Sequence, residues 1–198
     1  MAWASDQALP ALLERLRACR LCTDLPLGPR PVIRASSTAR VVICGQAPGT
    51  KVHHSGLSWN DPSGDRLRQW LAIDRPDFYD ETRIAVVPQG FCYPGKGAHG
   101  DLPPRKECAD TWHDRIFAAM PQIEVFILAG QYALAWHLGT RRKQNLTETV
   151  RAWREYAPRY YPLPHPSWHN NRWLKENPWF EAELVPALRE AVHPRVFG

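Results

Sequence analysis

VVICGQAPG, residues 41–49, joins an apolar run to a loop rich in glycine and proline. Consecutive valine and isoleucine residues are typical of a strand buried on both faces, as in parallel sheets. In open α/β sheets, ligands bind in the crevice beyond the carboxyl ends of such strands. The loop from Gly45 to Gly49 is therefore the first candidate for chemistry, although the same Gly-x-x-Pro-Gly pattern also occurs in ordinary tight turns.

Strand and helix patterns alternate on both sides of this stretch. Further strands are predicted at residues 83–88, 124–130 and 159–164. Helices are predicted at residues 6–20 with Ser5 as N-cap, from Ser63 through Leu71, and at 105–120, 131–138 and 181–192, with Pro186 as a kink in the last. A long loop is expected after Gly49. The alternation predicts one α/β domain over residues 1–198, in three α/β/α layers around a four-stranded parallel sheet.

Composition narrows the class of protein. The 198 residues fit one domain, and 44% hydrophobic content with mixed charges is typical of a globular chain. No apolar run approaches the roughly 20 residues of a membrane helix, and the first residues lack a basic segment followed by an apolar one. We therefore expect a cytoplasmic protein without a membrane partner. The net charge of +5 favours a polyanion as partner.

Four of the five cysteines stand in loops or at the ends of elements. Cys19 and Cys22 form a C-x2-C pair, and fifteen residues separate Cys92 from Cys108. In a cytoplasmic protein this pattern favours a metal site over disulfides, and spacing alone fits zinc and an iron–sulfur cluster equally. Such a site would anchor residues 1–38, which hold the first helix, C-x2-C and an extended connection, to the Gly/Pro-rich segment 90–104. Cys44 lies within the first strand, where a buried apolar role is expected.

Four features stand out along the chain: the C-x2-C pair with Cys92 and Cys108, GQAPG at 45–49, GLSWNDPSG at 56–64 and HPS at 165–167. Together they resemble the uracil-DNA glycosylase superfamily, closest to its iron–sulfur family 4 and related bacterial branches. GQAPG at 45–49 resembles the first active-site motif, and HPS at 165–167 resembles the second. GLSWNDPSG at 56–64 stands where the family has its uracil-stacking aromatic residue, here Trp59. The C-x2-C pair with Cys92 and Cys108 resembles the cluster ligands of family 4.

The resemblance implies a monofunctional glycosylase of base excision repair, acting as a monomer on DNA that contains uracil or another deaminated base. It also makes a [4Fe–4S] cluster on the four cysteines the expected cofactor, with zinc as the alternative. Breaking an N-glycosidic bond requires a flipped nucleotide, a stacking wall and a donor to the departing base. Trp59 is the expected wall, and His165 the expected donor.

The remaining expected site residues follow from where the chain departs from the family. The first motif has Gln46 and Ala47 where other branches carry an acidic residue, so the water is expected to depend on Gln46, His53 or Asp61. The family's uracil-reading asparagine falls on Pro88, which leaves Gln89 as the nearest amide.

The segment that starts with the second motif supplies the DNA contacts we expect. Ser167, Asn170 and Arg172, with the neighbouring Trp168 and His169, are candidates for phosphate contacts and for a wedge into the duplex. The same residues also fit an ordinary helix start with Asn170 as cap. Two rival functions remain open on the same fold. One is a non-catalytic nucleic-acid-binding protein, and the other is a protein that traps DNA covalently through a histidine.

Overall fold

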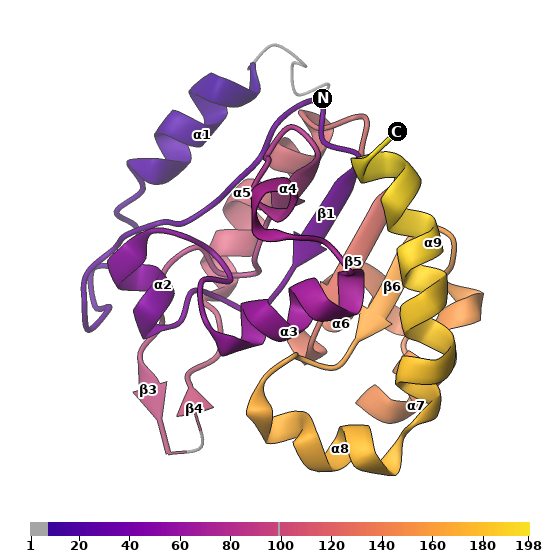
Figure 1. The fold of residues 1–198 in the computed structure, drawn as a ribbon. Coiled ribbons are helices and arrows are strands. Elements are labelled where there is room, and N and C mark those ends of the chain that lie inside the picture. The colour runs from indigo at the N-terminus through magenta and orange to yellow at the C-terminus, as the bar shows by residue number, and fades with distance from the viewer. Residues whose placement is uncertain (1–7, 99) are drawn as a thin grey trace.

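The computed structural model describes residues 8–98 and 100–198. Its centre is a four-stranded, all-parallel sheet in the order β2-β1-β5-β6, formed by β1 (Val41–Cys44), β2 (Ile84–Val86), β5 (Val125–Ala129) and β6 (Tyr160–Leu163) (Figure 1). Val41 pairs with Ile84 on one side and with Val125 on the other. The predicted α/β/α fold and all four predicted strands are confirmed.

Helices cover both faces of this sheet. The α-helices are α1 (Leu9–Arg17), α2 (Thr50–Ser55), α3 (Pro62–Leu71), α4 (Arg75–Phe78), α5 (Lys106–Ala118), α6 (Gln131–Leu138), α7 (Leu146–Arg151), α8 (Asn171–Glu176) and α9 (Val185–Val196). Short helical turns are η1 (Gly139–Arg141), η2 (Trp153–Glu155), η3 (Trp168–Asn170) and η4 (Phe180–Leu184), and a two-stranded hairpin joins β3 (Lys96–Gly97) to β4 (Gly100–Asp101).

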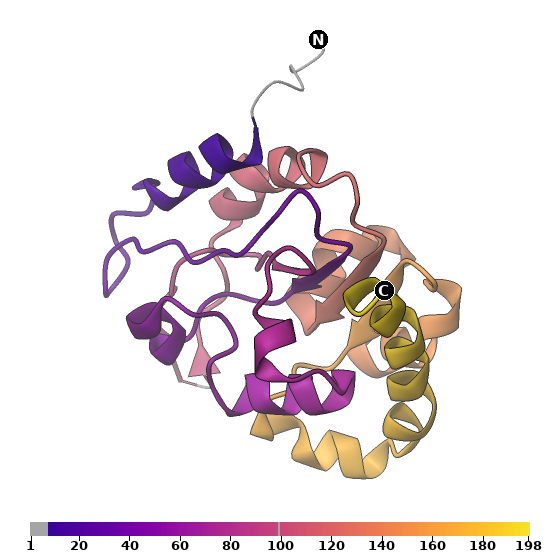
Figure 2. The same cartoon turned by 45° about the horizontal axis from the view of Figure 1, so that its top comes forward.

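Alternate residues of each strand enter two separate cores, because successive side chains of a strand point to opposite faces. Val42, Cys44 and Leu128 pack with α1, α5 and α6. Val41, Ile43 and Ile127 pack with α3, α9 and η4 on the other face. Figures 1 and 2 show these two helical layers, with α1 and α5 on one side of the sheet and α3 and α9 on the other.

Several predicted helix boundaries are wrong. The first helix spans Leu9–Arg17 and ends before Cys19, while the predicted cap Ser5 lies outside the described residues. Asp61, and not Ser63, caps α3: its Oδ1 accepts a hydrogen bond from Gly64 N at 2.8 Å. Pro62 then occupies the first helical position, where its missing N–H costs no intrahelical bond.

The closing helix and the loop after Gly49 also differ from prediction. The π-helical η4 runs directly into α9, so Pro186 lies in the first turn of α9, which continues past the predicted end to Val196 and contains Pro194. The segment after Gly49 begins with α2, whose sequence TKVHHS lacks an apolar stripe. Within the Gly/Pro-rich segment 90–104, the chain forms the hairpin β3–β4.

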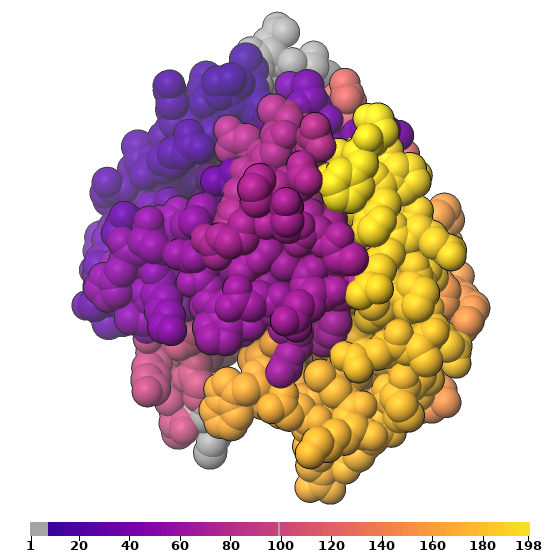
Figure 3. Space-filling view, viewed as in Figure 1, coloured from indigo at the N-terminus to yellow at the C-terminus, as the bar shows by residue number. Residues whose placement is uncertain are grey.

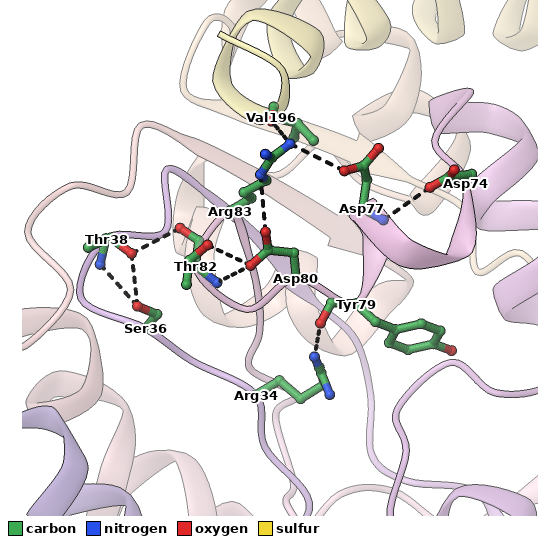
Figure 4. A network of polar contacts seen from close by, with 10 residues as sticks. All are labelled: Arg34, Ser36, Thr38, Asp74, Asp77, Tyr79, Asp80, Thr82, Arg83 and Val196. Carbon is green, nitrogen blue, oxygen red and sulfur yellow. Dashed lines mark hydrogen bonds and ion pairs between the residues drawn. The ribbon is translucent and has the colours of Figure 1, made fainter.

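A polar network closes the amino ends of the strands (Figure 4). Arg83 Nη1 donates to the backbone oxygen of Val196 at 2.7 Å and pairs with Asp77 and Asp80. Thr38 Oγ1 donates to Thr82 O at 3.1 Å, which ties the extended connection to the same corner. The carboxyl ends of the parallel strands face the other way, so the network leaves that edge free for a site. No helix in residues 8–98 and 100–198 is long and apolar enough to cross a bilayer.

Candidate active site

A cleft of about 890 Å³ opens at the carboxyl ends of the sheet strands. Its walls come from residues within 45–52 after β1, residues within 58–66 around the start of α3, residues 97–98 and 100–103 of the hairpin, and residues 165–169 after β6. The space-filling view shows a hollow between the hairpin and the segment that leads into α8 (Figure 3). The parallel sheet therefore brings both predicted motifs, GQAPG and HPS, to one place, as the sequence predicted.

Trp59 is fitted into this cleft by two glycines. A Cβ atom at Gly45 would lie 3.0 Å from the Trp59 ring, and one at Gly64 would lie 1.7 Å from the Trp59 carbonyl oxygen. Trp59 itself has a φ of 58°, a conformation that non-glycine residues rarely adopt. Strained backbone of this kind persists where the surroundings fix it, and it is found most often at functional sites.

Arg68 of α3 holds the backbone of Trp59 through a hydrogen bond to its carbonyl oxygen. Its side chain is buried, with 6% exposed, and Nη1 donates to Trp59 O at 3.2 Å and to Tyr79 Oη at 3.3 Å. Asp65 pairs with the same guanidinium, and Phe78 lies against its face. A buried arginine with this many partners keeps its charge satisfied while holding one carbonyl in place.

His165 stacks on Trp59. Their ring centroids are 5.5 Å apart and the ring planes differ by 29°. Burial lowers the pKa of His165, an effect that Asp61 opposes and His169 reinforces. Asn170 Nδ2 donates to the backbone oxygen of His165 at 2.7 Å, which fixes the turn that carries it. At neutral pH the ring is therefore neutral and can donate one hydrogen bond to a ligand in the cleft.

Polar groups of the cleft include two predicted residues. Asp61 lines it at the start of α3, and Gln46 lines it from the first motif. Gln46 Nε2 donates to the backbone oxygen of Leu102 at 3.1 Å, so the amide is already engaged with the hairpin. Ala47 and Ser167 also line the cleft.

Four other predicted residues lie outside the lining. His53 is buried on α2 against His54 and Tyr93, and Gln89 is buried with no hydrogen-bond partner for its Nε2 within residues 8–98 and 100–198. Asn170 supports the His165 turn, as described above. Arg172 is exposed and paired with Glu176. The predicted base-reading position, Pro88, does line the cleft, and its backbone oxygen contacts buried His113 at 3.0 Å.

Three charged residues of the cleft escaped the sequence analysis. Lys51 and Arg66 line it, and Arg66 donates to Ser167 O at 3.0 Å and to Asn171 Oδ1 at 2.8 Å. Asp101 of β4 lines it opposite Gly49, where an added Cβ would lie 3.4 Å from Asp101 Oδ2. Burial raises the pKa of Asp101, partly offset by Lys96. The sequence offered only weak signals for these three residues: Arg66 lies on amphipathic α3, and Lys51 and Asp101 lie in polar segments expected as loop.

The comparison with known families matches this arrangement. A family model described as the uracil DNA glycosylase superfamily matches residues 33–189, which include the whole sheet and both cleft motifs. The chain belongs to the uracil-DNA glycosylase superfamily. Members of this superfamily act on DNA.

The protein has a second, smaller cavity beside α1 and α5. All four predicted metal ligands line it, namely Cys19, Cys22, Cys92 and Cys108. Burial raises the pKa of both Cys92 and Cys108 to about 11, with the other thiols adding to the effect. Cys44 is fully buried in β1, and burial raises its pKa as well, which fits the apolar role predicted for it. The fold thus gathers the four separated cysteines around one space.

The thiols are not gathered as tightly as a single ion requires. Within the described ranges 8–98 and 100–198, no three His, Cys, Asp or Glu side chains are grouped closely enough to hold one metal ion. Four thiolates on one zinc, each about 2.3 Å from it, have sulfurs only about 3.8 Å apart. By chemistry alone, four thiols around one cavity are a donor set for either zinc or an iron–sulfur cluster.

Proposed function

We propose that the protein is a monofunctional DNA glycosylase that hydrolyses the N-glycosidic bond of uracil in DNA. The observation that carries the proposal is the stacked pair Trp59 and His165, contributed by two separate motifs and facing a cleft in a member of this superfamily. Such a pair offers a flipped base both a ring to stack on and a hydrogen-bond donor. Both contacts favour excision of a flipped base.

The chemistry assigned to His165 is donation, without loss of its proton. As the glycosidic bond breaks, both bonding electrons leave with the base and the sugar acquires oxocarbenium character. A neutral imidazole N–H placed at a base oxygen stabilises the negative charge that develops there, on the scale of about 2.7–4 kcal/mol for one such donor. The lowered pKa of His165 keeps the ring in the required neutral form.

Asp61 is the residue we assign to the attacking water and to the cationic sugar. It lines the cleft, whereas His53, the other candidate base, lies outside the lining. Gln46 can orient a water but cannot accept its proton, and its Nε2 is already hydrogen-bonded to Leu102 O. Water adds to the sugar carbon, and its proton passes to the carboxylate and then to solvent.

Base selection is expected to differ from that of branches with an asparagine at the end of β2. Pro88 occupies that place in the cleft wall and has no side-chain donor, while Gln89 points its amide into the protein. We therefore propose uracil as the first substrate, with hypoxanthine and xanthine as further deaminated bases to be tested in the same assay.

We also propose that the four cysteines hold a [4Fe–4S] cluster with a structural role, because base excision transfers no electrons. The support is the shared cavity lined by Cys19, Cys22, Cys92 and Cys108, together with the resemblance of their spacing to the cluster ligands of family 4. Bound there, the cluster would join the end of α1 to the segment after β2 and to the start of α5. Zinc is the alternative occupant.

The test is excision from a duplex with one uracil, followed by alkaline cleavage of the abasic sites. We expect Trp59→Ala and His165→Ala each to lower the single-turnover rate more than about tenfold, on the scale of one lost stacking or donor contact. His54→Ala is the matched control, because His54 is exposed on α2 outside the cleft, and its rate should match wild type.

The rival functions give different results in that assay. Tight binding of uracil DNA without strand scission would establish a non-catalytic binding protein. A protein–DNA adduct that survives denaturation would establish covalent trapping by a histidine. Scission that does not depend on Trp59 or His165 would mean that the catalytic residues lie elsewhere.

A further inference from the structure

Leu102 is an exposed leucine at the mouth of the cleft. It follows β4 directly, lines the cleft, and has 44% of its surface exposed. A single exposed leucine is common on proteins and usually needs no explanation. Leu102 differs from that background because its position is fixed and because another large apolar side chain lines the same cleft.

The backbone of Leu102 is held at both of its polar atoms. Its N–H donates to Gly95 O at 2.8 Å, and its oxygen accepts the Gln46 amide at 3.1 Å. The side chain packs over two glycines of the hairpin: Cβ atoms added at Gly95 and Gly97 would lie 3.3 Å and 3.1 Å from its methyl carbons. Pro103 and Pro104 follow and restrict the chain further. The leucine is therefore presented on a rigid support.

Trp168 lines the cleft from a different segment. It follows the HPS motif, has 70% of its surface exposed, and stacks on His169 with ring centroids 3.8 Å apart. The hairpin and the segment leading into α8 stand on two sides of the hollow in Figure 3, and the ribbon view shows the same separation (Figure 1). Two exposed apolar side chains thus border one opening that also contains Trp59 and His165.

We propose that Leu102 is a second wedge, which packs against the base pairs next to the flipped nucleotide from the side of the hairpin, while Trp168 contacts the duplex from the other side. The inference rests on the proposed function. It adds that the substrate is DNA that is base-paired around the damaged nucleotide. Extruding a nucleotide from a duplex breaks stacking on both sides of it, and apolar side chains inserted at base steps replace the lost contacts. Single-stranded DNA lacks most of that stacking and needs no such replacement.

The experiment compares Leu102→Ala with Leu27→Ala on two uracil substrates, one duplex and one single-stranded, under single-turnover conditions. Leu27 is a matched control because it is equally exposed, at 44%, and lies outside the cleft. We expect Leu102→Ala to lower excision from the duplex about tenfold and to leave the single-strand rate unchanged, whereas Leu27→Ala changes neither. Leu102→Met should restore most of the duplex rate, because it keeps a large apolar side chain.

The single-strand rate also serves as the check on folding, since a damaged active site would lower both rates. A second readout needs no excision: 2-aminopurine placed beside the uracil should brighten on binding wild type, and clearly less on binding Leu102→Ala. Equal losses on both substrates, or no loss on the duplex, would overturn the second wedge while leaving the glycosylase proposal standing. Wild-type protein that excises uracil from neither substrate would overturn the glycosylase proposal, and the fluorescence comparison would still decide the wedge.

Discussion

Replacing Gly64 by alanine should damage both the fold and the active site, although glycine-to-alanine changes inside helices usually stabilise by about 0.5–1 kcal/mol. The added methyl would lie 1.7 Å from Trp59 O and 2.5 Å from its carbonyl carbon, where ordinary contact begins at 3.4 Å. The Trp59 backbone and the first turn of α3 must therefore move apart. No flexible side chain stands at that contact to absorb the change.

The cost can be built from the contacts that this movement breaks. The bond from Gly64 N to Asp61 caps α3, and a lost cap costs about 1 kcal/mol. The bond from buried Arg68 to Trp59 O is charge-assisted, and such bonds contribute about 1.5–3 kcal/mol. We expect Gly64→Ala to lower the free energy of unfolding by about 2.5–4 kcal/mol. Displacement of the Trp59 ring should slow excision by about ten- to a hundredfold, the scale of one lost base stack.

Urea unfolding and single-turnover excision measure the two effects on the same preparation. Gln69→Ala is the control, since Gln69 is exposed on the same helix and its stability change should stay within about 0.5 kcal/mol. If Gly64→Ala were as stable and as active as wild type, the account of Trp59 as a residue held by α3 would be refuted.

Three further predictions concern pH and metal. Because burial lowers the pKa of His165, the excision rate should stay constant from pH 8 down to about 6.5 and fall only below that value; a midpoint above 6.5 would contradict a neutral donor. Burial lowers the pKa of His137 to about 3, so the unfolded chain binds an extra proton between about pH 6.5 and pH 3, and stability falls as pH drops through that window by about 1.4 kcal/mol per unit. His137→Leu should flatten this slope in urea titrations at pH 7 and pH 5, and an unchanged slope would show that other groups cause it. Protein purified without oxygen should be brown with broad visible absorbance, and Cys92→Ser should lose both colour and solubility; a colourless protein with stoichiometric zinc would transfer the site to zinc, and one without metal would defeat the proposed ligand set.

The sheet could be predicted because its strands are unbroken apolar runs. β1 and β5 consist of four and five buried residues. Helices cover both faces of the sheet, so both sets of alternating side chains must be apolar. Short polar elements carry no comparable signal. α2 has six residues without an apolar stripe, and the hairpin strands have two residues each, so both were expected as loop. Tertiary contacts determine such elements, and local periodicity does not report those contacts.

The same distinction, between residues with a local sequence signal and residues placed by tertiary contacts, applies to the site. Trp59, Asp61 and His165 were found because they stand in motifs, and the parallel topology brings those motifs to one edge of the sheet. Asp101 and Leu102 were missed because the hairpin's fold, and not its sequence, places them at the cleft. His53 was expected there as a candidate base for the water, but α2 turns its side chain toward Tyr93.

The most direct test of the central claim is alkali-dependent cleavage of a duplex that carries one uracil. Wild-type protein should convert the labelled strand to the fragment that ends at the uracil position, and His165→Ala should do so more than about tenfold more slowly. Absence of scission with uracil, hypoxanthine and xanthine substrates alike would contradict the assignment of glycosylase activity to this cleft.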